Sequence, residues 1–400
     1  MLAYPVAPCR LDPIGYSLAI WRAEVWTMME REVEIHRLAG TPRSLPEFAA
    51  AFPSEEVCID YLFRRRFPDG WACPVCHDTQ APYRHPSRRH VYRCRANHRH
   101  EVSLTANTIM HRTKLPICTW FWAAFLVTHG PPGMSALQLQ KQLGIGRYET
   151  AFQILHKMRA AMVRPARDLI GSPYPVEVDE TWIGGATQGE GKGVHHKTLV
   201  VGAVEVRPGS AIPFGGENPN LIGGQVPSKE AKGAARKGIR RKEGPRSMKG
   251  GHGRNIVAGR LRLRIVPNRT ADVLSGFVGQ AVLPGSLVRT DGWVGYEPLA
   301  SRGFRHDPVP VRGDSERIEA HLPMIHIVFG NLDAWLLGTH HGVSPKHLQA
   351  YLNEFTFRFN RRFWPRAAFD AVLGIGALVA GPTYAGLYEG IWTHPGGHVP

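Results

Sequence analysis

The sequence predicts an α+β protein in which small zinc-ribbon and helical domains precede a mixed β-sheet flanked by helices. Three observations support this class. Cysteines and histidines cluster at residues 73–100, apolar residues recur at helical spacing over residues 116–162, and alternating strand patterns begin at residue 176. A chain of 400 residues is long for one simple core, so we expect several domains.

The charge of the chain indicates a polyanionic partner. There are 49 Lys and Arg residues against 33 Asp and Glu residues, a formal net charge of +16. Each cation placed against a phosphate releases condensed counterions, which gives affinity for nucleic acid without sequence reading. An acidic protein partner, or a generally basic composition, is the alternative to double-stranded DNA.

The apolar stretches TWFWAAFLVT and AVLGIGALVAG are shorter than the roughly 20 residues that a bilayer requires. The N-terminus shows no basic region followed by an apolar run, as an export signal would. Six cysteines in this length do not suggest a disulfide scaffold. We therefore expect a cytoplasmic, nucleoid-associated protein without membrane contact.

Residues 1–44 show no clear period and are interpreted as a poorly defined N-terminal extension. Residues 45–112 should hold a helical lead-in and a small ribbon. The stretch LPEFAAAFPSEEVCIDYLFRRRF indicates two short helices. Pro46 suits a first helical turn, and Ser54 before two glutamates is typical of an N-cap with an acidic first turn.

The motif CPVC at residues 73–76 is typical of a knuckle that directs two thiolates at one metal ion. The short strand HVYRC brings in Cys94, but position 97 is Asn where a second CxxC motif would place a cysteine. His98 or His100 could be the fourth ligand, and His100 is favoured because it begins the next strand, HEVSLT. A ribbon held by packing alone is the alternative. The predicted structural zinc ligands are Cys73, Cys76, Cys94 and His100.

Residues 113–170 are predicted to form a helical DNA-binding region. TWFWAAFLVTHG is one apolar helix, and SALQLQKQLGIGRYETAFQILHKMRAAM has the outline of a helix-turn-helix. Any helical hairpin gives a similar outline, so plain packing is the alternative. The candidate DNA contacts here are Arg147, Lys157 and Arg159.

From residue 176 the pattern is strand, strand, strand, helix, strand: VEVDETWIGG, KTLVVGAVEV, GRLRLRIVPN, TADVLSGFVGQAV and SLVRTDGWVGY. This order predicts the opening of a ribonuclease H-like sheet within residues 171–375, followed by a C-terminal tail at 376–400. Thr270 should cap the helix, and the arginines of GRLRLRIVPN should lie exposed on one face.

An insertion at residues 207–254 separates the second and third strands. Its stretch KEAKGAARKGIRRKEGPRSMKGGHGR has ten Lys and Arg against two Glu, and it has too few apolar residues to fold alone. It is either a solvated linker or a mobile basic arm on the phosphate backbone. The candidate DNA contacts in it are Arg236, Lys237, Arg240, Arg241 and Lys242.

Two aspartates stand at comparable positions, Asp179 after the first strand and Asp291 closing the fourth. These strands are neighbours in a ribonuclease H-like sheet, so the carboxylates should converge and require a divalent cation between them. Paired Mg²⁺ ions activate a water or 3′-hydroxyl and stabilise the leaving oxygen in phosphoryl displacement. Either aspartate alone would suit a turn; together they predict a catalytic site.

The motifs together resemble bacterial insertion-sequence transposases of the DDE type, in the group with an N-terminal zinc ribbon and an ISXO-like catalytic domain. The resemblance spans about Leu45 to His394. It implies binding of the element's terminal inverted repeats, DNA cleavage and strand transfer, and a homo-oligomeric synaptic complex. Asp179 and Asp291 match the first two acids. The motifs that carry the resemblance are CPVC, SLTANTIMHRTKLP, VEVDETWIGG, TDGWVGY, NLDAWLLGTHHGVSPKHLQAYLNEFTFRFNRR and GPTYAGLY.

The family's third acid is a Glu on a later helix, with a Lys seven residues beyond it. Alignment through GTHHGVSPKH places His326 at the third position and Asp333 in place of the Lys. The resemblance thus implies an Asp-Asp-His site for Mg²⁺ or Mn²⁺, and imidazole suits Mn²⁺ better. Asn331 or Glu319 are alternative ligands. A catalytically inactive transposase-derived DNA-binding protein, or a nuclease without the joining step, is the alternative function.

Two further glutamates have expected structural roles. Glu180 should face the opposite side of its strand from Asp179, because side chains alternate along a strand. Glu354 should form a salt bridge with Arg358, one helical turn further on.

Overall fold

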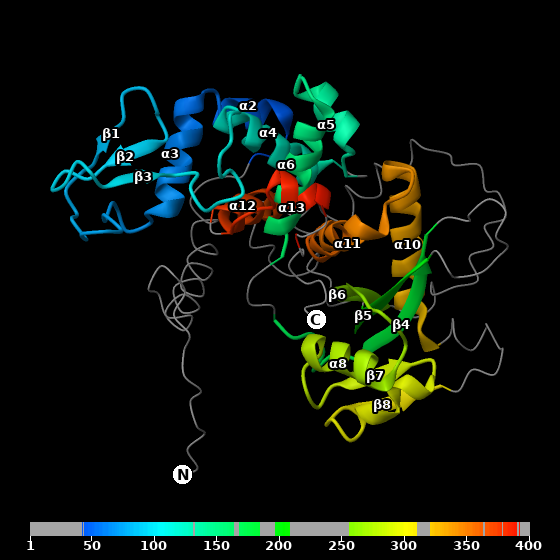
Figure 1. Cartoon of the computed structure of the whole chain (residues 1–400). Coiled ribbons are helices and arrows are strands. Elements are labelled where there is room, and N and C mark those ends of the chain that lie inside the picture. Colours follow the sequence, from blue (N-terminus) through cyan, green and yellow to red (C-terminus); the bar gives the residue numbers. More distant parts are fainter. Residues whose placement is uncertain are drawn as a thin grey trace, which may run out of the picture.

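The computed structural model describes residues 42, 44–130, 133–163, 168–184, 197–208, 256–309, 321–362, 365–377, 379–389 and 392 (Figure 1). Almost all of the N-terminal extension and of the basic insertion lies outside these residues. The five candidate DNA contacts at positions 236–242 therefore lie outside the described part of the chain. No described helix is both long and apolar enough to cross a bilayer.

The lead-in forms the two predicted helices, α2 (Leu45–Ala51) and α3 (Glu55–Arg66). Ser44 and Ser54 cap them, since each hydroxyl accepts a backbone N–H of the first turn. An antiparallel sheet of β1 (Tyr83–Arg84), β2 (Val91–Arg93) and β3 (Glu101–Ser103) follows. The two predicted strands are confirmed as β2 and β3. Strand β1, two exposed residues long, was not predicted.

The helical region contains α4 (Ile117–His129), α5 (Ala136–Gln142) and α6 (Tyr148–Ala161), as predicted. Gly144, with φ of 61°, makes the turn between α5 and α6 in a conformation that favours glycine.

Helix α12 (Pro365–Gly376) returns to this region and shares its apolar core, with Phe369 packed against the aromatic rings of Phe48 and Phe121. All but its last residue lies inside the range 171–375 that the sequence predicts for the catalytic domain, yet the helix packs on α4 and α6. The short helix α13 (Tyr384–Glu389) follows it.

The second sheet contains β4 (Val176–Ile183), β5 (Thr198–Pro208), β6 (Ile256–Ile265), β7 (Leu287–Thr290) and β8 (Arg305–Pro308). Its order is β6-β5-β4-β7-β8; β4, β5 and β6 are antiparallel, while β7 runs parallel to β4 and β8 parallel to β7. The predicted mixed sheet is confirmed, with its first and fourth strands adjacent. Strand β8 was not predicted, because RHDP lacks apolar alternation.

Helices cover both faces of this sheet (Figure 1). Helix α8 (Ala271–Ala281) and the 3₁₀ helix η2 (Val294–Leu299) pack on one face, and α10 (Pro323–His340) and α11 (Pro345–Asn360) on the other. Val176 and Val178 join the core beneath α8. Because side chains alternate along a strand, Glu177 and Asp179 lie on the α10 face. Thr270 precedes α8 as predicted, but its hydroxyl donates to the Asn268 side chain rather than capping the helix.

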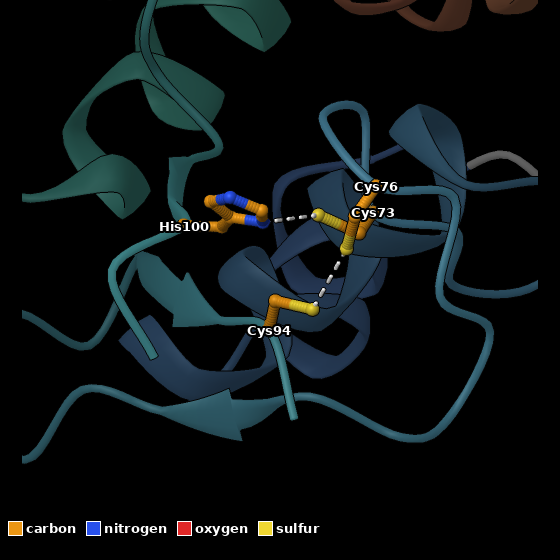
Figure 2. Close-up of side chains that lie close together, drawn as sticks. All are labelled: Cys73, Cys76, Cys94 and His100. Carbon is orange, nitrogen blue, oxygen red and sulfur yellow. Dashed lines mark hydrogen bonds between the residues drawn. The ribbon is translucent and has the colours of Figure 1, made fainter. Parts of the chain in front are cut away.

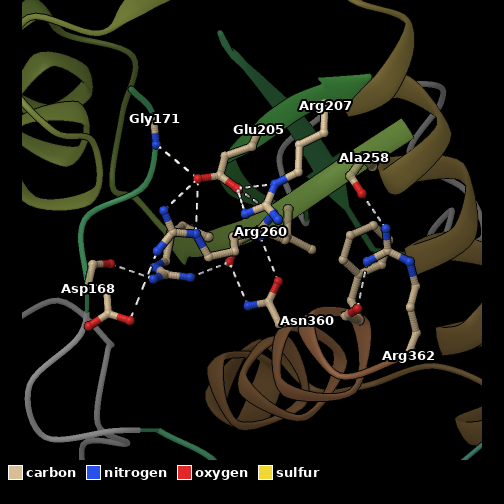
Figure 3. Close-up of polar contacts among 11 residues, drawn as sticks. Asp168, Gly171, Glu205, Arg207, Ala258, Arg260, Asn360 and Arg362 are labelled. Carbon is tan, nitrogen blue, oxygen red and sulfur yellow. Dashed lines mark hydrogen bonds and ion pairs between the residues drawn. The ribbon is translucent and has the colours of Figure 1, made fainter. Parts of the chain in front are cut away.

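The arginines of β6 are not an exposed row, so that prediction is wrong (Figure 3). Arg260 donates to the fully buried carboxylate of Glu205 on β5, which also accepts from Arg207 and from the backbone N–H of Gly171. Arg262 donates to the carbonyl of Asp168. These half-buried arginines tie the edge strand to its neighbours instead of standing free in solvent.

Candidate active site and zinc cluster

The two aspartates meet at the same end of adjacent parallel strands. Val176 of β4 pairs with Val288 of β7, and Asp179 and Asp291 each lie three residues beyond that pair. The sheet register therefore places them level with each other. Asp179 is 9% exposed, and Asp291 lies just past the end of β7, where its carboxylate accepts the backbone N–H of Trp293.

His326 lies in the first turn of α10, over the strand that carries Asp179. Its imidazole Nε2 is 3.8 Å from Asp179 Oδ2. The structure thus brings His326 of α10 against Asp179 of β4, and Asp291 at the end of β7 is near enough for its charge to act on Asp179.

The electrostatics of the site favour a bound cation. Burial raises the pKa of Asp179 to about 7, and the nearby carboxylates of Glu180 and Asp291 act in the same direction. A bound divalent cation would offset this crowding of negative charge. Two carboxylates and an imidazole are donors that Mn²⁺ and Mg²⁺ accept, so the chemistry of these residues suits such an ion. Among the described residues, the donor atoms that already lie within 4.8 Å of one another are those of the cysteine and histidine cluster at residues 73–100.

Glu180 is engaged by protein groups on the other side of β4, as expected. It pairs with Arg269 and accepts a hydrogen bond of 2.6 Å from the Tyr296 hydroxyl. Tyr296 is fully buried in the core beneath α8. These contacts agree with the structural role expected for Glu180.

The position of each residue on α10 distinguishes His326 from the alternative third ligands. Asn331 is exposed and five residues beyond His326, which places it about 140° around the helix. Asp333 is exposed and seven residues beyond His326, so it lies on the same helical face two turns away. Glu319 lies outside the described residues. Among the described candidates, His326 is the one that contacts Asp179.

The predicted zinc ligands form a compact cluster (Figure 2). The donor atoms of Cys73, Cys76, Cys94 and His100 all lie within 4.8 Å of one another. Cys73 Sγ is 3.7 Å from His100 Nδ1, and Cys76 Sγ is 3.4 Å from Cys94 Sγ. Ligands of a tetrahedral zinc ion at about 2.3 Å would be spaced about 3.8 Å apart, so this donor set fits zinc.

The knuckle also lowers the pKa of one of its thiols and so favours the thiolate form. Burial alone would raise the pKa of Cys73, but hydrogen bonds from the backbone N–H groups of Cys76 and Val75 lower it to about 7. Asn97 stands where a second CxxC motif would place a cysteine, and its Nδ2 lies 3.2 Å from His100 Nε2. That contact orients the imidazole with Nδ1 toward the thiolates.

Two of the predicted DNA contacts on α6 are wrong. Arg159 is 1% exposed and forms an ion pair of 2.8 Å with the fully buried Glu354 of α11. Lys157 is buried and donates to the carbonyl of His111. Helices α11 and α12 cover this end of α6, which the sequence of α6 alone does not reveal. Arg147, just before α6, is exposed.

The ion pair of Glu354 is formed with another helix and not within α11, although the charge of Glu354 still favours the charged form of Arg358. Glu354 pairs with Arg159, while Arg358 donates to the carbonyls of Val127 and Gly130 at the end of α4. Helix α11 is therefore joined to the helical region by two separate sets of polar contacts.

The sequence pattern by itself indicates no role for Glu177, although its spacing from Asp179 places both residues on one face of β4. The side chain is fully buried and accepts the backbone N–H groups of Met324 and Ile325 at the start of α10. The alternation of VEVDE was the available signal. Only the structure supplies the helix that this glutamate contacts.

Comparison with known proteins gives two family matches. Residues 53–100 match a transposase zinc-ribbon domain, and residues 215–360 match an ISXO2-like transposase domain. No curated protein and no solved structure matches the chain. The second match includes Asp291 and His326 but begins after Asp179, whose place in the site follows from the sheet register. Both matched regions are thus similar to domains of IS1595 transposases.

Proposed function

We propose that this protein is the transposase of an insertion sequence, which binds the element's terminal inverted repeats and catalyses metal-dependent DNA cleavage and strand transfer. One observation supports it above the others. Asp179 and Asp291 lie at the same height along neighbouring parallel strands, and the His326 imidazole lies 3.8 Å from the Asp179 carboxylate. Such a set holds divalent ions that activate a water or a 3′-hydroxyl and stabilise the leaving oxygen.

Each residue has a distinct part in this proposal. Asp179, within the sheet, and Asp291, at the more open strand end, bind the ions through their carboxylates. His326 binds from the helix side through Nε2. The cluster of Cys73, Cys76, Cys94 and His100 would hold Zn²⁺ and keep the ribbon in shape.

The partner in this proposal is double-stranded DNA, both at the element ends and at the target. The net charge of +16 favours a polyanion, and the exposed Arg147 and the basic insertion supply cations for phosphate contact. Because two element ends must be joined, we propose that the protein acts as a homo-oligomer and works at the nucleoid.

The experiment compares strand transfer and DNA binding for Asp179→Ala and Asp291→Ala. We expect each substitution to lower strand transfer of pre-cleaved ends by at least about a hundredfold, with DNA affinity unchanged in an anisotropy titration. Asp272→Ala is the matched control, because Asp272 is 98% exposed on α8 and outside the site. Unchanged strand transfer in the two site variants would contradict the proposal.

One observation favours the catalytically inactive DNA-binding protein as a second candidate. Asp333 places an exposed anion on the His326 face of α10, where a cation would attract phosphate. This candidate gains support if the wild-type protein binds element ends but neither cleaves nor joins DNA with Mg²⁺ or Mn²⁺.

A further inference from the structure

We propose that Glu177 is a positioning residue, which holds the first turn of α10 against β4 and thereby fixes His326 opposite Asp179. This inference rests on the proposed function of the site formed by Asp179 and His326. It concerns a residue that needs no contact with metal or DNA.

The first turn of α10 depends on the sheet for its hydrogen bonds. Its N-cap is Leu322, which makes no side-chain capping bond, and Pro323 has no backbone N–H to donate. The next two N–H groups, of Met324 and Ile325, donate to Glu177 Oε2 at 2.7 Å and 2.9 Å. A residue of β4 thus performs the capping that the helix's own sequence does not provide.

The charge of Glu177 is matched to this position. The side chain is fully buried, and a buried carboxylate is costly unless it is well hydrogen-bonded. The N-terminal end of a helix carries a partial positive charge and unsatisfied N–H groups. The contact therefore stabilises the carboxylate and the helix end together, so each holds the other in place.

The same strand segment sets both halves of the site. Glu177 and Asp179 are two residues apart on one face of β4, roughly 6.6 Å along the strand. Glu177 accepts a hydrogen bond from the backbone N–H of Ile325. Asp179 lies 3.8 Å from the imidazole of His326, the next residue of α10. Movement of this turn away from Glu177 must therefore move the imidazole away from Asp179.

The neighbouring strand leaves room for this close approach. Gly202 of β5 pairs with Asp179 in the sheet. A Cβ at Gly202 would lie 2.9 Å from both Ile325 Cδ1 and Phe329 Cε1, which real Cβ atoms essentially never do. Helix α10 is thus seated directly on the sheet at this point, and Glu177 fixes where along β4 its first turn begins.

Glu205 is the matched control for a merely structural glutamate. It is equally buried, lies on the adjacent strand β5, and pairs in register with Val176. Its carboxylate accepts hydrogen bonds from Arg207, Arg260 and the backbone N–H of Gly171, and these three residues lie outside α10. Loss of Glu205 should cost stability without changing the position of His326.

The experiment compares Glu177→Gln and Glu205→Gln in the full chain with two readouts. The first is hydrogen exchange of the Met324 and Ile325 amides. The second is Mn²⁺ affinity from a spin-resonance titration, with Asp179→Asn defining binding elsewhere. For Glu177→Gln we expect at least about tenfold faster exchange at both amides and about tenfold weaker Mn²⁺ binding, the usual scale for a residue that supports a metal ligand. Glu205→Gln should change neither.

Wild-type exchange and Mn²⁺ affinity in a folded Glu177→Gln protein, or equal Mn²⁺ weakening in Glu205→Gln, would overturn the inference. Glu177→Asp provides a second variant should the glutamine fail to fold, because it keeps the charge but shortens the reach; it should show the same two changes. Absent strand transfer in a wild-type protein that shows these effects would count against the proposed function and leave the role of Glu177 supported.

Discussion

The zinc cluster and the candidate active site assemble their donors in different ways. The four donors of the cluster come from residues 73–100, within one ribbon that has its own sheet. The three proposed donors of the candidate active site come from β4, the end of β7 and α10, which are separated by long stretches of chain. The cluster therefore depends on local turns, whereas the candidate active site depends on sheet register and on the position of α10 against the sheet.

The two sites also shift the pKa of a metal-ligand side chain in opposite directions. In the ribbon, burial would raise the pKa of Cys73, but backbone N–H groups of its own knuckle lower it to about 7. In the sheet, burial and the nearby Glu180 and Asp291 raise the pKa of Asp179 to about 7. The first arrangement stabilises an anion before the metal binds; the second concentrates charge that the metal would relieve.

The largest effect should follow from removing zinc. Zinc binding contributes about 10–16 kcal/mol to the folding of small zinc domains at neutral pH. Cys94→Ser should abolish zinc binding and expose the amides of β2 and β3 to exchange, while those of β4 and β5 stay protected. Zinc content and hydrogen exchange measure this. Cys118→Ser, outside the cluster, should retain its zinc, and a protected ribbon in metal-free Cys94→Ser would contradict local assembly around zinc.

The next effect concerns the metal preference of the assembled site. His326→Glu exchanges imidazole for the carboxylate of the family pattern, which is a harder ligand. We expect the ratio of Mg²⁺-supported to Mn²⁺-supported strand transfer to rise about tenfold. The control is Ile327→Glu, which adds the same charge at a neighbouring position that is 49% exposed. An equal rise in both variants would mean that charge alone, rather than coordination, sets the preference.

A smaller effect should come from lifting α10 off the sheet. Gly202→Ala adds a Cβ that lies 2.9 Å from side chains of α10, and overpacking of this kind typically costs about 1–3 kcal/mol. We expect lower thermal stability and weaker Mn²⁺ binding. Gly279→Ala on α8, where a Cβ meets no atom within 4 Å, should leave Mn²⁺ binding unchanged. Unaltered Mn²⁺ affinity in Gly202→Ala would mean that metal binding does not depend on the close packing of α10 against the sheet.

The smallest effect should be a change in acid stability. Burial would raise the pKa of Glu205, but bonds from Arg260, Gly171 and Arg207 hold it below its usual value of 4.5. A lowered carboxyl pKa adds stability above the unfolded pKa, and that stability is lost as pH falls below about 4.5. Each pKa unit corresponds to about 1.4 kcal/mol. Denaturant unfolding from pH 7 to pH 3 should show the wild-type advantage over Glu205→Gln shrinking, and a constant advantage would contradict this.

Sequence periodicity was sufficient for the longer elements and for the local metal cluster. Ser44 and Ser54 cap the expected helices, and the CPVC knuckle directs its thiols toward Cys94. Strands β1 and β8 were missed because each is short and polar, so no alternation marks it. The longer elements were predicted and these two strands were not, because a segment of two to four residues is too short to show a periodic pattern.

The errors at α6 have another cause. Lys157 and Arg159 carry the pattern of a basic helix face, but α11 and α12, far along the chain, cover them. The candidate active site could be predicted in part from the sequence, because the strand pattern indicated Asp179 and Asp291. His326 came from family resemblance alone, and no pattern in α10 indicates that Glu177 would cap it. Contacts between distant segments are not encoded in local periodicity.

We propose that Asp179, Asp291 and His326 together bind a divalent cation. Anomalous diffraction from crystals grown with Mn²⁺ tests it most directly. We expect a manganese peak within coordinating distance of Asp179 and Asp291, with His326 Nε2 as a further ligand. Crystals that show no manganese at these carboxylates, or manganese held only elsewhere on the chain, would contradict it.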